Sequence, residues 1–318
     1  MLHSSYIQLI TFRQRWQQVH HPLLQKKNIS LWLCHLHTDI PGVSGNKCLK
    51  LKYHLQQVIE QNKAGVFTFG GAFSNHLCAV AASCNYLKLR SVAYVRTDTL
   101  DSDNPTLAFC RQQGMQLIAL DRSNYRQRSD QAFIAELNLS HPDLLFVPEG
   151  GSSLEGCRGV AELDLMSTPE GAANLIVSAA ASGGTLAGMI NRHNCPVLGI
   201  AVVRDSSLQT RVQQLLNQDS RDKQWQLNHQ FTGKGYGHFD AQLLQFCRSM
   251  AEQNVQVEPI YTGKALAGVF SLIEQDEIAN NSRISFFHTG GLQGLNGLKY
   301  RGLITENDFA LLSGSAAD

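Results

Sequence analysis

The sequence has no excess of charge and no long apolar run. Its 318 residues include 27 basic and 26 acidic side chains, a formal net charge of +1. No block of Lys and Arg forms a stripe that could follow nucleic-acid phosphates or an anionic membrane surface. The longest weakly polar stretch, residues 175–190, is interrupted by serines, glycines and a threonine, whereas a membrane span needs about 20 apolar residues. We therefore expect neither nucleic acid nor a membrane as partner.

Paired cysteines and a secretory leader are also missing. The eight cysteines are scattered and form no CxxC pair. Cysteines of this kind are typical of buried free thiols in a reducing compartment, not of disulfides or a zinc site. The first 16 residues lack the basic segment and apolar segment of a signal peptide. These features predict a soluble, cytoplasmic protein without a metal site.

Short apolar runs alternate with glycine turns and helical patterns, from about 50 to 150 and again from about 151 to 318. A hydrophobic share of 43% excludes a disordered chain, and the length suits two domains or one large one. The alternation predicts parallel sheets in two α/β lobes, with a small-molecule site in the cleft between them. We expect strands at 66–69, 91–95, 115–120, 144–147, 175–180, 196–203 and 283–287. We expect helices at 75–86, 105–113, 184–193, 206–217 and 263–275. The pattern does not assign 218–237.

A small-residue turn, Ser182-Gly183-Gly184-Thr185, joins the strand expected at 175–180 to the following helix. Glycines let successive N–H groups point into one concavity at a helix start, which favours a phosphate. The turn lacks the lysine of a Walker loop and does not form GxGxxG. Alone, it also fits an ordinary strand-to-helix connection.

A second segment, residues 44–51, carries two lysines at the start of a predicted helix. Lys47 and Lys50 lie three positions apart and so share a face. Cations oppose the helix dipole at this end, so a nearby anion would explain them: one lysine could bond a cofactor carbonyl and the other a phosphate. From this segment alone, two solvated surface lysines remain the alternative.

Three further segments carry candidate polar groups. In the run 70–76, the hydroxyl of Ser74 and the amide of Asn75 could face a ligand, although Ser74 also suits a helix N-cap. His76 is expected to be a partly buried side chain, not a metal ligand. The runs 261–265 and 288–291 are each expected to follow a strand and open a helix, where α/β sites form. Lys264 is a rival Schiff-base lysine.

Together the five segments resemble pyridoxal-phosphate enzymes of the tryptophan-synthase β-subunit fold, known as fold type II. Within that group they are similar to the D-cysteine desulfhydrase / 1-aminocyclopropane-1-carboxylate deaminase family. The similarity extends from about residue 44 to 297, on SGNK..KLKY, FGG.FSNH, SGGT.AG, YTGKA and HTGG. It implies a two-lobed, three-layer α/β/α fold with parallel-rich sheets and the active site between the lobes. A large lobe would comprise 1–47 and 151–318, and a small lobe 48–150. It also implies pyridoxal 5'-phosphate (PLP), a small amino-acid substrate and a homodimer.

The resemblance also assigns roles to individual residues. Lys47 would be the Schiff-base lysine and Lys50 a phosphate contact. Ser74 would lie near the substrate carboxylate or the proton being moved, and Asn75 beside the phenolic oxygen of the cofactor. The other implied positions are the phosphate loop of Ser182, Gly183, Gly184, Thr185 and Leu186, the substrate-facing Tyr261, and Thr289 at the pyridine nitrogen.

Two threonines bear on the reaction. The deaminase branch typically has Glu where this chain has Thr262, and Leu where it has Thr289, so both positions follow the desulfhydrase pattern. Opening a cyclopropane ring benefits from an acid that keeps the pyridine nitrogen protonated, and expelling a thiolate from Cβ needs this less. We therefore expect β-elimination from a small D-amino acid, foremost D-cysteine, giving pyruvate, hydrogen sulfide and ammonia.

Three alternatives stay open at this point. One keeps the class and changes the substrate: 1-aminocyclopropane-1-carboxylate deaminase, or another PLP-dependent β-eliminating lyase. Another is a non-catalytic PLP-binding protein. It is suggested by residues 34–37, where Cys-His-Leu-His stands in place of the charged segment usual in the family. A second departure from the family is Cys48-Leu49 between the two lysines, where a bulky residue and Arg are often found. The last alternative, a nicotinamide oxidoreductase, is disfavoured because GxGxxG is absent.

Overall fold

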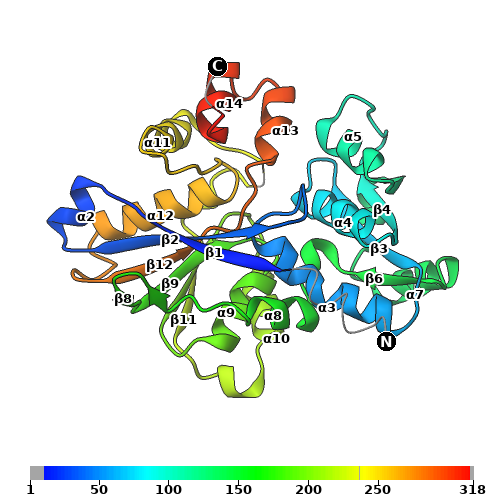
Figure 1. Ribbon diagram of the computed structural model, residues 1–318, viewed down its shortest axis with the longest axis horizontal. Helices are drawn as coiled ribbons and strands as arrows, with labels where there is room; N and C mark the ends of the chain where they lie inside the picture. The colour runs from blue at the N-terminus through cyan, green and yellow to red at the C-terminus, as the bar shows by residue number, and fades with distance from the viewer. Residues whose placement is uncertain (1–10, 236, 316–318) are drawn as a thin grey trace.

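Two parallel-rich sheets organise the chain, for which the computed structural model describes residues 11–235 and 237–315 (Figure 1). The larger sheet has six strands in the order β1-β2-β12-β9-β10-β11. β1 pairs antiparallel with β2, and the other neighbours are parallel. Its strands span Phe12–Gln18 (β1), Ser30–Thr38 (β2), Leu175–Ala180 (β9), Val197–Ala201 (β10), Trp225–Asn228 (β11) and Arg283–Phe287 (β12).

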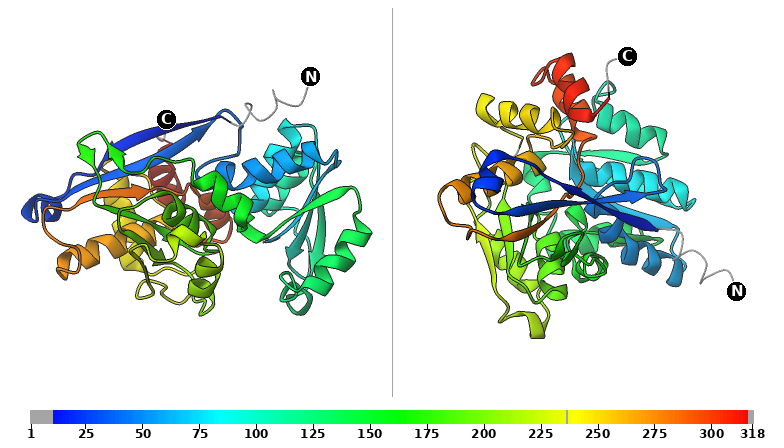
Figure 2. Two further views of the ribbon diagram at one scale, coloured as in Figure 1. Left: turned by 90° about the horizontal axis from the view of Figure 1, so that it is seen from below. Right: turned by 60° about the vertical axis from the view of Figure 1, so that its left-hand side comes forward.

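The smaller sheet is parallel throughout, in the order β5-β4-β3-β6. Figure 2 shows the two sheets side by side, with the β1–β2 hairpin reaching from the larger one towards the smaller. The strands of the smaller sheet span Gly65–Gly71 (β3), Arg90–Arg96 (β4), Gln116–Leu120 (β5) and Leu144–Val147 (β6). A separate two-stranded ribbon is formed by Ser167–Thr168 (β7) and Gly171–Ala172 (β8).

Helices connect the strands and cover the sheets, because parallel neighbours need a crossover between them. In Figure 1, α8, α9 and α10 lie on one side of the larger sheet and α11 and α12 on the other. In the first half of the chain the helices are Pro22–Lys26 (α2), Asn46–Glu60 (α3), Asn75–Tyr86 (α4), Pro105–Gln112 (α5), Arg122–Tyr125 (α6), Gln131–Ser140 (α7) and Leu154–Val160 (α8). In the second half they are Gly184–Arg192 (α9), Leu208–Gln214 (α10), Ala241–Ala251 (α11), Thr262–Glu274 (α12), Gly294–Tyr300 (α13) and Glu306–Ser313 (α14), and the short 3-10 helices are Glu149–Gly151 (η1) and Gln218–Ser220 (η2).

The central strand β9 shows why the larger sheet is covered on both faces. Ile176 and Ala180 pack into the core that includes α9, and Val177 and Ala179 pack into the core that includes α12. Successive side chains of a strand point to opposite faces, so a strand with a helix layer on each side is apolar at nearly every position. The three-layer, parallel-rich α/β fold expected from the sequence is confirmed.

The chain departs from the expected elements in two regions. The N-terminal hairpin of β1 and β2 was not expected, because β1 is an edge strand rich in Gln and Arg and gives little apolar signal. The unassigned segment 218–237 contains η2 and β11, the other edge strand. The lobe boundaries at 47/48 and 150/151 stay a prediction.

The expectation of a strand before Tyr261 is wrong. Residues 255–260 form a buried irregular segment. The carbonyl of Gln256 is bonded by the His288 ring, and Pro259 has no N–H to give a sheet. The other segment, 288–291, follows β12 as expected.

All eight cysteines are free thiols, and seven of them are buried. Among the described residues, no helix is long and apolar enough to cross a membrane. Over the same part of the chain, no group of three or more His, Cys, Asp or Glu side chains is arranged to hold a metal ion.

Candidate active site

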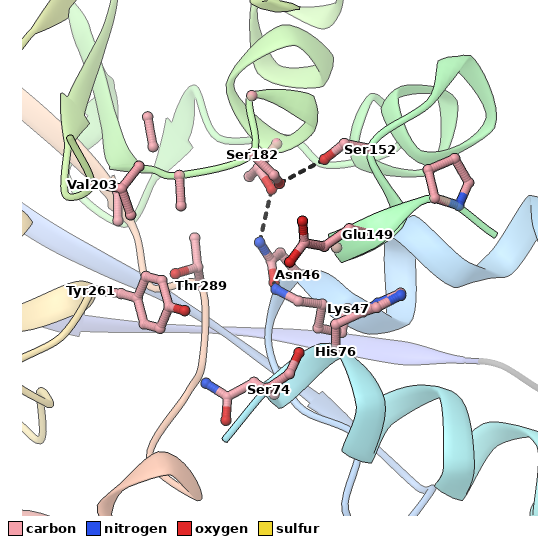
Figure 3. Close-up of a pocket in the computed structure, with 18 of the residues that line it drawn as sticks. Asn46, Lys47, Ser74, His76, Glu149, Ser152, Ser182, Val203, Tyr261 and Thr289 are labelled. Carbon is pink, nitrogen blue, oxygen red and sulfur yellow. Dashed lines mark hydrogen bonds between the residues drawn. The ribbon is translucent and has the colours of Figure 1, made fainter. Parts of the chain in front are cut away.

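A pocket of about 540 Å³ lies between the two sheets and brings together residues from all five segments (Figure 3). Its wall includes Lys47, Ser74, Asn75, Ser182, Gly183, Thr185, Leu186, Tyr261 and Thr289. Lys50 and Gly184 lie directly behind this wall, against Ser182 and Ser152. The sequence-predicted site residues therefore gather at one cavity.

A backbone contact brings the lysine segment against the last segment of the site. The N–H of Asn46 donates to the carbonyl of Thr289 over 3.2 Å. Gly45 has φ +59°, and a Cβ at this position would lie 2.1 Å from the same carbonyl oxygen. Only glycine fits such an approach. Lys47 and Thr289 consequently reach the pocket from adjacent backbones.

Lys50 forms the centre of a buried polar cluster. Its side chain is 1% exposed, and Nζ donates to Ser152 Oγ over 2.8 Å and to Ser182 Oγ over 3.2 Å. In the described part of the chain, no carboxylate lies within ion-pair distance of Nζ. Burial, and then the charge of Lys47, lower the pKa of Lys50 to about 7. A buried cation without a counterion is costly, so this cluster suits a bound anion.

The turn before α9 has the shape of an anion cradle. Gly183 has φ +90°, and a Cβ at Gly184 would lie 3.0 Å from Ser152 Oγ and 3.2 Å from Lys50 Cε. The amide of Asn46 donates to Thr185 Oγ1 over 2.8 Å and holds the first turn of the helix against α3. A helix start with glycine on its concave side exposes N–H groups to an anion.

Lys47 extends into the pocket from the first turn of α3 (Figure 3). Its Nζ donates to Asn46 Oδ1 over 2.7 Å. Burial lowers the pKa of Lys47 to about 8, because the low-polarity surroundings disfavour the ammonium form. A larger fraction of neutral amine is then present near neutral pH, which is what a nucleophilic or basic lysine needs.

Ser74 and Asn75 lie at the start of α4 and line the pocket. Figure 3 shows Ser74 across the pocket from Ser182 of the anion cradle. Ser74 occupies the N-cap position, but its hydroxyl accepts no helix N–H. Asn75 lies against Gly291, where a Cβ would be 3.2 Å from its Nδ2. The helix start and both polar side chains therefore face the cavity, an arrangement that suits a carboxylate or a phenolic oxygen.

Tyr261 is positioned by a residue that sequence reasoning missed, the buried Glu258. The Glu258 carboxylate accepts the N–H groups of Ile260, Tyr261 and Thr262 over 2.7–3.1 Å. Burial raises its pKa to about 7, although these hydrogen bonds act in the opposite direction. The carboxylate fixes the backbone at the start of α12 and thereby the place from which the Tyr261 ring enters the pocket.

Two other expectations can be compared with the structure. Lys264 does not reach the pocket: its Nζ bonds backbone carbonyls, including those of Thr232 and Gly235 at 3.3 and 3.1 Å. His76, expected to be partly buried, is fully buried, and its Nε2 lies 2.8 Å from Thr68 Oγ1.

The altered stretch at 34–37 lies inside β2. Cys34 and Leu36 are buried in the core, and the ring of His35 is 4.7 Å from that of His288. None of the four residues lines the pocket.

The segment 148–152 was also missed. It contributes Glu149, Gly150 and Ser152 to the pocket wall. The signal was present, because a glycine pair follows the strand expected at 144–147, as in the other site segments. Only contact with Lys50 and Ser182 distinguishes it from an ordinary turn.

The residues present fit PLP. The glycine turn and the uncompensated ammonium of Lys50 match a phosphate, Lys47 lies within the same cavity, and the hydroxyl of Thr289 lines it at another wall. Glycine keeps the anion cradle open for the phosphate, because a Cβ added at Gly184 would fill part of it.

Comparison with known proteins agrees with this chemistry. A family model described as "Pyridoxal-phosphate dependent enzyme" matches residues 20–290. A protein of Arabidopsis thaliana, "Bifunctional D-cysteine desulfhydrase/1-aminocyclopropane-1-carboxylate deaminase, mitochondrial", is 30% identical over 289 residues, covering 81% of this chain and 71% of that protein. A "Putative 1-aminocyclopropane-1-carboxylate deaminase" of Thermotoga maritima is 26% identical over 280 residues, covering 81% of this chain and 87% of the relative.

The fold is shared with solved structures. A crystal structure described as an ACC deaminase homologue superimposes with a TM-score of 0.75 at 23% identity, covering 96% of this chain and 95% of the other. The chain therefore belongs to the pyridoxal-phosphate dependent enzymes, in the family of D-cysteine desulfhydrases and 1-aminocyclopropane-1-carboxylate deaminases.

Proposed function

We propose that this enzyme catalyses β-elimination from a small D-amino acid, with D-cysteine as the foremost substrate. The observation that carries the proposal is the neutral hydroxyl of Thr289 on the pocket wall. Among the described lining residues two are acidic, Glu149 and Asp205, and each pairs with an arginine. A pyridine nitrogen facing a hydroxyl suits the loss of a thiolate better than ring opening. Thr262, the other branch-specific position, is fully buried against Glu258 and does not line the pocket.

The chain supplies the binding groups. Lys50, Ser152 and the 182–186 turn would hold the phosphate of PLP, and Thr289 its ring nitrogen. Ser74 and the first N–H groups of α4 would hold the α-carboxylate, and Asn75 would bond the phenolic oxygen. The Tyr261 ring would limit the space on the substrate side and exclude water from it.

Bound PLP supplies an electron sink for the breaking of bonds at Cα and Cβ. Lys47, its pKa lowered by burial, would take the Cα proton at Nζ. The Cβ–S bond then breaks with its electron pair on sulfur, and hydrolysis releases pyruvate and ammonia beside hydrogen sulfide. In this account a single amine is both the point of cofactor attachment and the base.

The test compares two substrates on one preparation. D-Cysteine should release sulfide and pyruvate, and 1-aminocyclopropane-1-carboxylate should give little 2-oxobutanoate. The reverse preference would make the deaminase the function, and that alternative is favoured by the names of the curated relatives. Bound PLP without turnover on D- and L-amino acids would favour the non-catalytic alternative. The nicotinamide alternative is dropped, because the family is PLP-dependent.

We also propose a homodimer and a cytoplasmic location, on the basis of the family resemblance and of the reduced thiols. Light scattering on the purified protein tests the first proposal, and fractionation of the source cells tests the second. The plant relative is named as mitochondrial.

A further inference from the structure

The smaller sheet presents two guanidinium groups at the pocket wall. Arg96 ends β4 and Arg128 follows α6, and both line the cavity. They lie against the buried ring of Tyr125, with their guanidinium carbons 5.5 and 4.9 Å from its centre. Such stacking holds a guanidinium in place while its N–H groups remain available.

The two arginines differ in their partners. Arg128 Nε donates to Glu149 Oε2 over 2.5 Å, and the Tyr125 hydroxyl donates to Glu149 Oε1 over 2.6 Å. The side chain of Arg96 makes no ion pair or hydrogen bond with any other residue that the structure describes, although its backbone pairs within the sheet. Arg128 is thus neutralised within the protein, and the charge of Arg96 faces the cavity.

Arg96 lies beside the turn that leads to Ser74. It is in register with Gly71 across β3 and β4, and its Nη2 is 3.7 Å from where a Cβ at Gly71 would lie. The carbonyl of Gly71 in turn accepts the N–H of Ser74 over 3.0 Å. Because Gly71 has no side chain, the guanidinium of Arg96 can lie over this turn. It is then next to Ser74, which is proposed to hold the α-carboxylate.

The other cationic groups at the cavity have a protein partner or a ligand group to bind. Arg211 pairs with Asp205, and Arg204 Nε donates to the carbonyl of Gly233. Lys50 and the glycine turn suit the phosphate, and the start of α4 suits the α-carboxylate. Arg96 is an additional cation on the substrate side of this cavity.

We propose that Arg96 binds a second anionic group, carried on the β-substituent of the substrate. The substrate class is then a β-substituted alanine whose leaving group bears a carboxylate, sulfonate or phosphate, and this inference rests on the proposed β-elimination. When the β-substituent is joined through sulfur, the Cα–H and Cβ–S bonds of the thioether break. Lys47 Nζ takes the Cα proton, and the electron pair of the Cβ–S bond leaves on sulfur. One water then converts the remainder to pyruvate and ammonia, and the thiol is released with its anionic group unchanged.

The experiment uses two compounds of equal shape that differ in charge, S-carboxymethylcysteine and S-carbamoylmethylcysteine, as racemates on the PLP-loaded enzyme. Arg96→Gln should lower the ratio of kcat/KM for the carboxymethyl over the carbamoylmethyl compound at least tenfold, while kcat/KM for D-cysteine changes less than threefold. This ratio is measured in the variant and in the parent. Because both enzymes act on the same two compounds, the difference between the two leaving groups cancels in the comparison. Arg158→Gln is the matched control, since Arg158 is exposed, stacks on Tyr53 and lies outside this pocket.

An unchanged ratio overturns the proposal. An equal loss for all three compounds also overturns it, because Arg96 would then bind the common α-carboxylate or support the fold. If the parent enzyme turns over none of them, β-elimination has failed but the anion site is still tested. The carboxymethyl compound should raise the thermal unfolding midpoint more than the carbamoylmethyl compound, and Arg96→Gln should abolish the difference. Equal shifts in the parent protein would contradict the site itself.

Discussion

Lys50 and Ser182 share a hydrogen bond of 3.2 Å across 132 residues of chain, and Ser152 bonds both. The contact joins α3 to the turn before α9. Among the described residues, the buried ammonium of Lys50 has only hydroxyl groups as side-chain partners, so a bound anion would compensate its charge.

Replacement of Lys47 by alanine should remove the covalent link to PLP. The purified variant should lack the absorbance band at about 410–430 nm that a lysine-linked PLP gives, and turnover should fall below detection. Lys52→Ala is the control, because Lys52 lies on the same helix and pairs with Glu162 instead of facing the pocket. Retention of the band in the Lys47 variant would exclude the assignment and reopen the choice of lysine.

The cradle should not tolerate a side chain at Gly184. In Gly184→Ala the new Cβ would lie 3.0 Å from Ser152 Oγ and 3.2 Å from Lys50 Cε. We expect PLP to bind at least tenfold more weakly, about 1.4 kcal/mol, measured by equilibrium titration of the apoprotein. Gly114→Ala has no neighbour within 4 Å and should leave the affinity unchanged, although its φ of +80° costs stability. Equal affinities for both variants would place the phosphate elsewhere.

Because of Lys50, the free energy of unfolding of the apoprotein should rise with pH. The pKa of Lys50 is about 7 in the folded protein against 10.5 ordinarily. Above pH 7 the unfolded chain therefore binds more protons than the native state, and the free energy of unfolding increases with pH. Relative to Lys50→Met, the parent should gain about 1 kcal/mol per pH unit between about pH 7 and 8.5, as measured by urea unfolding. Parallel curves for parent and variant would show that the ammonium is not buried uncompensated. Lys52→Met serves as the control on the same helix.

Glu258 should affect turnover more than cofactor binding. Glu258→Gln weakens the acceptor for three backbone N–H groups around Tyr261. Hydrogen bonds to a charged group contribute about 1.5–3 kcal/mol, so we expect kcat/KM to fall about tenfold or more while the PLP absorbance band is retained. The exposed Glu252→Gln serves as control. Full activity in the Glu258 variant would show that the placement of Tyr261 does not depend on this carboxylate.

The sequence was informative where a signal is local. Strands 144–147, 175–180 and 283–287 and helix 75–86 were predicted at their observed bounds, because buried parallel strands are continuous apolar runs and glycines mark their ends. The edge strands β1 and β11 were not predicted, since an exposed edge carries polar residues like those of a loop.

The sequence alone determined the fold class and the family, and it indicated candidate residues for a phosphate and a reactive amine, because each depends on residue type and local spacing. The tertiary structure decided which of these residues meet. It separated Lys47 from Lys264, added Ser152 and Glu258 to the site, and left Arg96 facing the cavity while Arg128 is paired. Burial and contacts between distant segments set these outcomes, and neither quantity is contained in the spacing of residues along the chain.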